Sequence, residues 1–161
     1  LLAPILRQLG EGFVLHYTGG PAAEKDKAQM PPNMIDMGRL QGDAAVVAAM
    51  QNADALLFPS RSEGHPLVAI EAMACGLPII GMHGSSVSEA VTDGQTGLLC
   101  PQNDVAAFVT ATRSLAADHA RYARLAQAAR LQAVEHFSET TMINAYLHLY
   151  HCVAAGAKGA L

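Results

Sequence analysis

The stretch that decides the fold runs from residue 60 to residue 78 and has the sequence SRSEGHPLVAIEAMACGLP. A short apolar run at residues 55–58 precedes it and has the length of a buried strand. Residues 67–74 contain neither glycine nor proline, which predicts a helix that Gly76 ends. The pattern is therefore a strand, a polar loop and a helix, with Gly64 at the turn.

Such a loop has a defined place in an open α/β sheet. It lies at the carboxyl edge of the strands, where ligands bind. The first backbone N–H groups of the following helix have no acceptor within the helix, and this end of the helix dipole is positive. The sequence therefore predicts a place for an anion at the start of the helix over residues 67–74.

Two acids belong to this unit, Glu63 in the loop and Glu71 about one turn inside the helix, on the face of Leu67. An ionised carboxylate only accepts hydrogen bonds, and its two oxygens suit two neighbouring hydroxyls. This arrangement favours a ligand with hydroxyls at both ends and phosphate in the middle, such as a nucleotide sugar. In the alternative interpretation, Ser60 or Ser62 caps the helix and Glu71 belongs to a solvated face.

Composition sets the class of protein. The 161 residues are 51% hydrophobic and 15% charged, which indicates one folded domain with its own core. The net charge of −4, without a basic run, disfavours a nucleic-acid partner. The longest apolar stretch, residues 44–50, is far too short to span a membrane, and no signal peptide is visible.

Cysteine and histidine usage predicts a cytoplasmic protein without a metal. Cys75, Cys100 and Cys152 are odd in number and far apart, so we expect reduced thiols. His148 and His151 have no carboxylate or cysteine at ligand spacing, and the chain has no Asp-x-Asp pair. We therefore expect neither a metal site nor a cofactor.

Short strands alternate with helices along the chain, which predicts an α/β fold with a parallel, helix-covered sheet. The expected strands are residues 13–17, 33–38, 55–58, 77–81 and 98–100. The expected helices are residues 1–9, 44–50, 67–74, 86–91, 104–117, 118–137 and one that starts after Ser138. The last helix has an apolar stripe of Met142, Ala145, Tyr146, Leu149 and Tyr150.

Several helices have a candidate cap at their start. Asp43 precedes one helix, Asn103 or Asp104 another, and Asp118 and Ser138 two more. The sequence Ser-x-x-Glu that begins at Ser86 and ends at Glu89 has the form of a capping box.

Three segments together resemble a known family: residues 53–60 (ADALLFPS), the pair Glu63-Gly64 followed by Glu71, and residues 71–78 (EAMACGLP). They are similar to the donor-binding half of retaining GT-B glycosyltransferases, above all glycosyltransferase family 4, which is related to sucrose and glycogen synthases. That family carries two glutamates separated by seven residues. The similarity continues through residues 88–99 (SEAVTDGQTGLL) to the last helix. It implies a Rossmann-like parallel sheet flanked by helices, the C-terminal half of a GT-B fold.

The resemblance implies transfer of a sugar from a nucleotide diphosphate donor, with retention, to an acceptor that it does not define (a glycan, a lipid or a small molecule). Glu63 would hydrogen-bond the donor sugar and help to fix its anomeric carbon, and Glu71 would hold the ribose. Whether Glu63 also acts as a nucleophile stays open. The diphosphate would rest on the amides around Gly64, His65, Pro66 and Leu67.

Two further segments are implied in donor binding. A glycine-rich turn contains Gly20, and the loop with Arg39 and Leu40 would lie near the nucleotide base. From the residues alone, a turn that merely reverses the chain and an ordinary surface arginine explain the two segments equally well.

The chain also departs from the family. His65 stands in place of a frequent phenylalanine, and Ser85-Ser86 with Ser88 replace a Gly-Gly and a proline. The family's phosphate-binding Arg and Lys, the first strand of this domain and the N-terminal acceptor domain all precede Leu1. We therefore expect residues 1–161 to be one domain of a larger two-domain cytoplasmic enzyme, weak in donor binding and inactive alone. Attachment of the whole enzyme to the inner membrane face stays open.

Two other functions compete with this one. Another GT-B-like enzyme, such as a nucleotide-sugar epimerase, would share the fold. A non-catalytic nucleotide-sugar-binding or scaffold module would also share it. Replacement of Glu71 by alanine separates a ligand role from a structural one, because only the first predicts lost nucleotide affinity at unchanged melting.

Overall fold

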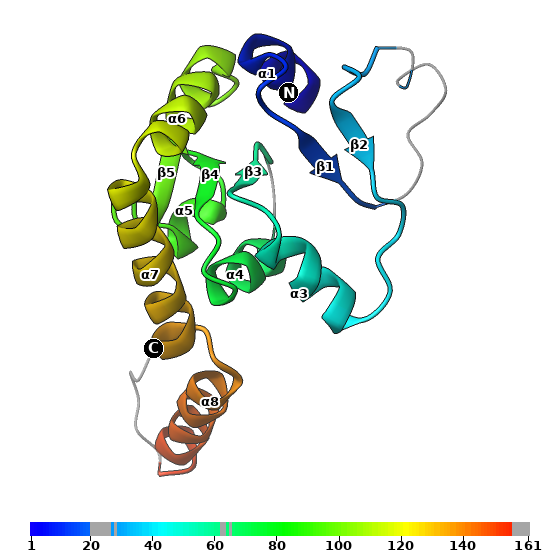
Figure 1. Ribbon diagram of the computed structural model, residues 1–161. Coiled ribbons are helices and arrows are strands. Elements are labelled where there is room, and N and C mark those ends of the chain that lie inside the picture. Colours follow the sequence, from blue (N-terminus) through cyan, green and yellow to red (C-terminus); the bar gives the residue numbers. More distant parts are fainter. Residues whose placement is uncertain (20–26, 28, 62–63, 65, 156–161) are drawn as a thin grey trace.

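The computed structural model describes residues 1–19, 27, 29–61, 64 and 66–155, which form an α/β body with a projecting C-terminal helix (Figure 1). The strands are β1 (Leu15–Tyr17), β2 (Met34–Asp36), β3 (Leu56–Phe58), β4 (Ile79–Met82) and β5 (Gly97–Cys100). The helices are α1 (Leu2–Leu9), α3 (Asp43–Gln51), α4 (Leu67–Ala74), α5 (Val87–Ala90), α6 (Val105–Ala117), α7 (His119–His136) and α8 (Glu139–Ala154). Every expected strand and helix forms, with small shifts at the ends, and the α/β prediction is confirmed.

All strand pairs are parallel, but in the described residues they form two sheets. One contains β1 and β2, and the other has the order β3-β4-β5. The N–H of Leu15 donates toward β2 and the N–H of Leu56 donates toward β4. Because successive residues of a strand point their backbone groups to opposite sides, His16 and Leu57 direct theirs to the other edges of β1 and β3. These two edges have no partner strand in the described part of the chain.

Strand β4 is the centre of the molecule because both of its faces are buried. Ile79 belongs to a core with α4, α5 and α7, whereas Ile80 and Met82 belong to a second core with α1 and α6. This alternation follows from the period of two in a strand. A parallel strand covered on both sides is accordingly apolar throughout.

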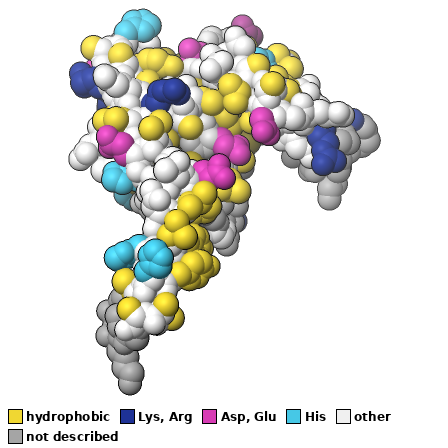
Figure 2. Space-filling model, turned by 90° about the horizontal axis from the view of Figure 1, so that it is seen from below, with side chains coloured by type: hydrophobic (Ala, Val, Ile, Leu, Met, Phe, Trp, Pro, Cys, Tyr) yellow, Lys and Arg dark blue, Asp and Glu magenta, His cyan; other side chains and the backbone are white. Residues whose placement is uncertain are grey.

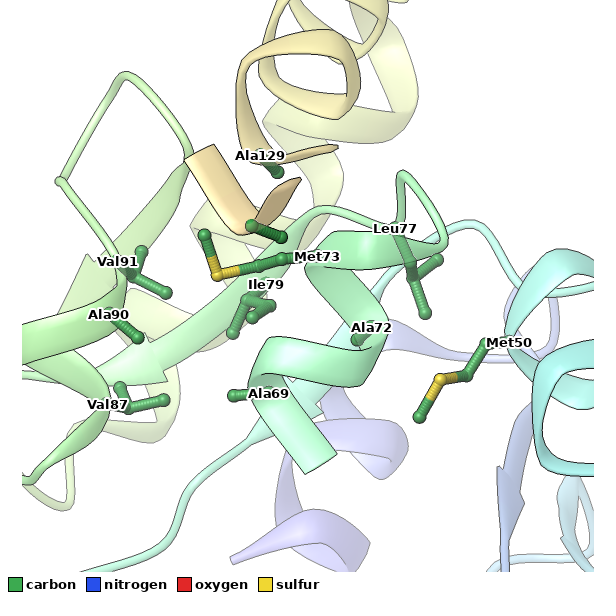
Figure 3. Packing of buried hydrophobic residues seen from close by; sticks show 11 residues of the cluster. Met50, Ala69, Ala72, Met73, Leu77, Ile79, Val87, Ala90, Val91 and Ala129 are labelled. Atoms are coloured by element: carbon green, nitrogen blue, oxygen red, sulfur yellow. The ribbon is translucent and has the colours of Figure 1, made fainter. Parts of the chain in front are cut away.

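Helix α4 is fixed to the body by one apolar face. Ala69, Ala72 and Met73 are fully buried and recur at helical spacing, and Ala129 of α7 is packed in the same cluster. Figure 3 shows the Met73 side chain extending from α4 toward Val91, between Ile79 and Ala129. Small alanines on both helices allow this close approach.

The end of α4 confirms the predicted stop at Gly76. Gly76 has φ +74°, and its N–H donates to the carbonyl of Met73, while the N–H of Leu77 donates to the carbonyl of Ala72. These two bonds form a Schellman motif, in which a residue with positive φ satisfies the last helical carbonyls. Glycine adopts this conformation without steric cost.

Three capping predictions are confirmed. The side chains of Asp104, Asp118 and Ser138 accept hydrogen bonds from the N–H groups of Ala107, Arg121 and Thr141, at the starts of α6, α7 and α8. Each bond satisfies an amide that has no acceptor within its helix.

Two capping predictions are wrong. Asp43 is the first residue of α3, and the N-cap is Gly42, so the Asp43 side chain makes no capping bond. Ser86 has helical dihedrals, φ −57° and ψ −19°, which do not aim its hydroxyl at the first amides of α5. The Ser86 hydroxyl is buried and has no hydrogen-bond partner, so the expected capping box with Glu89 does not form.

The helices were also compared with the length of a bilayer. No helix in the described part of the chain is both long and apolar enough to cross a membrane.

Candidate functional site

The candidate site lies where β3, β4 and β5 end. Because the three strands are parallel, the loops that follow them meet at one edge of the sheet. Helix α4 follows β3, α5 follows β4 and α6 follows β5. The starts of these helices therefore determine what this edge can bind.

The start of α4 carries no side-chain cap. Its N-cap residue is Pro66, whose carbonyl accepts hydrogen bonds from the N–H groups of Ala69 at 2.9 Å and Ile70 at 3.1 Å. The alternative in which Ser60 or Ser62 is the helix cap is therefore wrong. The N–H groups of Leu67 and Val68 have no acceptor among the described residues, and they lie at the positive end of the helix.

The surface around these amides is open. Leu67 is 60% exposed and Val68 46% exposed. Gly64 is exposed, and a Cβ placed on it would meet no atom within 4 Å. A ligand can therefore approach the first turn of α4 without displacing a side chain of the described residues.

Glu71 is exposed and lies on the same face of α4 as Leu67, as the sequence predicts. Its carboxylate makes no hydrogen bond with the described residues. Desolvation raises the pKa of the nearby Cys75 thiol, the guanidinium of Arg130 lowers it, and the charge of Glu71 adds a smaller increase. Glu71 is thus an available acceptor one turn beyond the open amides.

The remaining predicted residues divide into two groups. Glu63, His65 and Gly20 lie outside the described residues. Arg39 is exposed and Leu40 half-buried in the loop after β2. The hydroxyl of Thr18 donates to the carbonyl of Gly38 at 2.6 Å and so joins this loop to the end of β1. The structure thus brings Arg39 and Leu40 to the carboxyl edge of the smaller sheet.

Sequence reasoning did not assign a site role to the serines after β4. The hydroxyls of Ser85 and Ser88 donate to the carbonyl of Met82 at 3.0 and 3.3 Å, and the N–H of Gly84 donates to Ser88 Oγ at 3.1 Å. These bonds hold the turn at the same edge as the start of α4. The replacement of Gly-Gly by Ser85-Ser86 was the available signal.

The start of α6, two strands away, has the opposite character. The carboxylate of Asp104 accepts a hydrogen bond from the N–H of Ala107 at 2.9 Å. Burial, together with the charges of Asp93 and Asp104, raises the pKa of the Cys100 thiol to about 11. A thiolate is disfavoured at this edge, and so is a bound anion, because the same two carboxylates repel it.

The largest hollow found on the described surface lies elsewhere. It has a volume of about 310 Å³ and is lined by β5, α6 and the start of α7, with Arg121 and Asp93 as its charged residues. It does not reach α4 or Glu71. No group of three or more His, Cys, Asp or Glu side chains among residues 1–19, 27, 29–61, 64 and 66–155 could hold a metal ion.

Comparison with known proteins identifies similar chains. A model of the family "Glycosyl transferases group 1" matches residues 5–132. Glycogen synthase of Mycobacterium tuberculosis is 36% identical over 113 residues, which cover 70% of this chain and 27% of that protein. D-inositol 3-phosphate glycosyltransferase 1 of Catenulispora acidiphila is 29% identical over 94% of this chain and 38% of its own length.

Solved structures share the fold. Sucrose-phosphate synthase of Thermosynechococcus elongatus has a TM-score of 0.81 at 25% identity, over 97% of this chain and 42% of that one. Anabaena Alr3699/HepE in complex with UDP and glucose has a TM-score of 0.80 at 18% identity, over 93% of this chain and 43% of that one. The chain thus spans less than half the length of these relatives.

Proposed function

The chain belongs to the group 1 glycosyl transferases, and from this premise we propose that it binds the nucleotide-sugar donor of a glycosyltransferase. The observation that supports this proposal most is the open start of α4. This helix begins without a side-chain cap at the carboxyl edge of a parallel sheet, with exposed Leu67 and Gly64 around its first amides. HepE, a structural relative, was solved with UDP and glucose.

The spacing along α4 suits a nucleoside diphosphate. The diphosphate accepts hydrogen bonds from the N–H groups of Leu67 and Val68, where the helix dipole also favours negative charge. Glu71 lies four residues further, roughly 6 Å along the helix axis, and accepts hydrogen bonds from the ribose diol. We assign no metal to this step, because the helix start itself supplies positive potential to the diphosphate.

The same proposal gives roles to the other predicted residues. Glu63 positions the donor sugar for transfer with retention, while Gly64, His65 and Pro66 line the diphosphate. Gly20, Arg39 and Leu40 face the nucleotide base. The exposed guanidinium of Arg39 supports this role, because it is free to reach a ligand at the edge of the β1–β2 sheet.

The two sheets support a further part of the proposal, that a longer polypeptide completes the domain. A doubly wound fold has the strand order 3-2-1-4-5-6 and binds its ligand where the order reverses. The observed strands, β2-β1 and β3-β4-β5, correspond to this order without its first strand. A parallel strand ahead of α1 would pair with the free edges at His16 and Leu57 and join the sheets. An N-terminal domain before that strand would then supply the acceptor site.

We include a cytoplasmic location in the proposal. All three cysteines, Cys75, Cys100 and Cys152, are free thiols, which is usual in a reducing compartment. The names of the matched relatives, a synthase and a glycosyltransferase, favour sugar transfer over an epimerase or a scaffold.

The test is a calorimetric and NMR titration of the complete polypeptide with UDP, GDP and ADP, each with Mg²⁺ and with EDTA. We expect one nucleotide to bind saturably, with an affinity that EDTA changes less than about twofold, and to perturb the amides of residues 64–71. Binding that requires Mg²⁺ would contradict the metal-free role of α4. Absence of binding to all three, or perturbation confined to the start of α6, would overturn the donor-site proposal.

A further inference from the structure

Helix α8 contributes nothing to the core of the described structure. It has 16 residues, Glu139–Ala154, and none of them is buried. In Figure 1 it extends away from the body beyond the end of α7. Every other helix of the described residues buries at least one side chain against a sheet or a neighbouring helix.

One face of α8 is apolar and exposed to water. Its large hydrophobic side chains are 45–66% exposed: Met142, Ile143, Tyr146, Leu147, Tyr150 and Val153. They recur at spacings of three and four residues, so they lie on one side of the helix. Asn144, His148 and His151 occupy the other side. Figure 2 shows hydrophobic side chains gathered along one side of this arm and histidines on another.

The direction of α8 is fixed by its first turn. The Ser138 hydroxyl accepts a hydrogen bond from the N–H of Thr141 at 3.2 Å, and the Thr141 hydroxyl donates to the carbonyl of Glu135 at 3.0 Å. The second bond joins α8 to the last turn of α7. The apolar face is therefore presented in a defined orientation and not on a free tail.

A lipid surface does not suit this face. Helices that lie on membranes carry Lys and Arg on the polar side, where these residues attract anionic lipid. Residues 138–155 contain neither Lys nor Arg, and Glu139 adds a negative charge.

A second copy of the chain does not suit it either. A 16-residue helix is roughly 24 Å long and 10 Å wide, so one of its faces covers about 250 Å². A stable interface between separate molecules needs about 800 Å² from each partner. Two copies that meet only through α8 fall well below this area.

We propose that the apolar face of α8 docks against a second domain of the same polypeptide. Within one chain, linkage replaces a bimolecular encounter by an effective concentration in the millimolar range, so a small face is sufficient. The structural match to sucrose-phosphate synthase covers 97% of this chain, which cannot omit a 16-residue helix, and more than half of that protein lies outside the match. The family model, in contrast, ends at residue 132, before α8.

The exposed side chains define the surface that α8 recognises. Tyr146 and Tyr150 lie with ring centroids 6.1 Å apart, and both hydroxyls need polar partners once the rings are covered. The receiving surface is therefore an apolar groove with hydrogen-bond acceptors along its rim. This inference does not depend on which nucleotide, if any, binds near α4.

Hydrogen–deuterium exchange of α8 tests the proposal, measured in residues 1–161 and in the complete polypeptide. We expect the amides of residues 142–153 to exchange at least about tenfold more slowly in the complete polypeptide. Equal exchange in both proteins, or a complete polypeptide no longer than this chain, would overturn the proposal.

Two matched variants identify the face. Ile143→Asp places a charge on the apolar side, and Asn144→Asp places the same charge one residue away, on the polar side. We expect Ile143→Asp to abolish the added protection in the complete polypeptide and Asn144→Asp to keep it, with little effect of either on the melting of residues 1–161. Loss of protection in both variants contradicts a face-specific dock. Dimerisation of residues 1–161 that Ile143→Asp abolishes, or its flotation with anionic vesicles, would assign α8 to a second copy or to a membrane instead.

Discussion

The starts of α4 and α6 are built from the same topology and have opposite properties. Each helix follows a parallel strand that pairs with β4, so both begin at one edge of the sheet. At α6 the Asp104 carboxylate occupies the first amides. At α4 the cap is Pro66, which has no side-chain acceptor, and the amides of Leu67 and Val68 stay open to a ligand.

This difference shows how a fold separates stability from binding. A side-chain cap contributes roughly 1 kcal/mol to the stability of a helix, and α4 does without it. Its stability comes instead from the buried face of Ala69, Ala72 and Met73 and from the Schellman motif at Gly76. The helix start that lacks a cap is therefore the one that a ligand can use.

The largest effect is expected when α4 is made electrostatically similar to α6. Leu67→Asp adds a carboxylate at the first helical residue, where it favours the helix dipole but repels a diphosphate. We expect donor affinity of the complete polypeptide to fall roughly 100-fold by calorimetry, while the melting temperature stays the same or rises slightly.

Leu67→Asn is the matched control, since it has the same shape without the charge. We expect it to lower affinity less than about fivefold. Equal losses in the two variants would mean that α4 does not hold an anion.

The next effect concerns Glu71. Glu71→Ala removes an exposed carboxylate without disturbing the core, so we expect donor affinity to fall about 10-fold, or roughly 1–2 kcal/mol, at unchanged melting temperature. Glu135→Ala, which removes an exposed acid from α7, serves as the comparison and should alter neither quantity. A Glu71 variant that melts earlier but binds normally would make Glu71 a structural residue.

A smaller effect, on stability alone, is expected at α6. Asp104→Ala removes the cap on Ala107, and the free energy of unfolding should fall by about 1 kcal/mol in a urea titration. Donor affinity should stay the same, because α6 does not face the ligand. A loss of affinity would show that the two helix starts share one site and would break the comparison.

The smallest effect is a pH dependence from Cys100. Its pKa is raised in the fold from 9.0 to about 11, so the folded state retains the proton that the unfolded state loses first. The stabilisation is thus present below about pH 9 and is lost as the pH rises toward 11. We expect the free energy of unfolding to fall across this window more steeply in the native protein than in Cys100→Ala. Parallel slopes would mean that the environment of Cys100 does not hold the thiol neutral.

Local features of the sequence determined most of the elements. Apolar runs and Gly or Pro breaks located every strand and helix of the described residues, because these signals act within a few residues. The caps at Asp104, Asp118 and Ser138 were predictable for the same reason, since the acceptor is close in sequence to the amide it binds. Asp43 and Ser86 failed because capping also requires a backbone conformation that the residue type alone does not specify.

The candidate site was predictable only in part. The positions of Gly64, Leu67 and Glu71 around the start of α4 followed from one continuous stretch of sequence. The serine turn after β4 was not found as part of the same edge, because its place depends on the pairing of β3 with β4. The contrast with α6 was hidden for the same reason.

By itself, the sequence determined the α/β class, the succession of elements and the motif that relates the chain to group 1 glycosyl transferases, because periodicity, turn residues and motif spacing are local properties. The tertiary structure alone decided which helix starts share an edge, that β1 and β3 keep free edges, and that the apolar face of α8 is uncovered. These features depend on contacts between residues that are far apart in the chain. A local pattern shows that a helix has an apolar face, and only packing shows whether anything covers it.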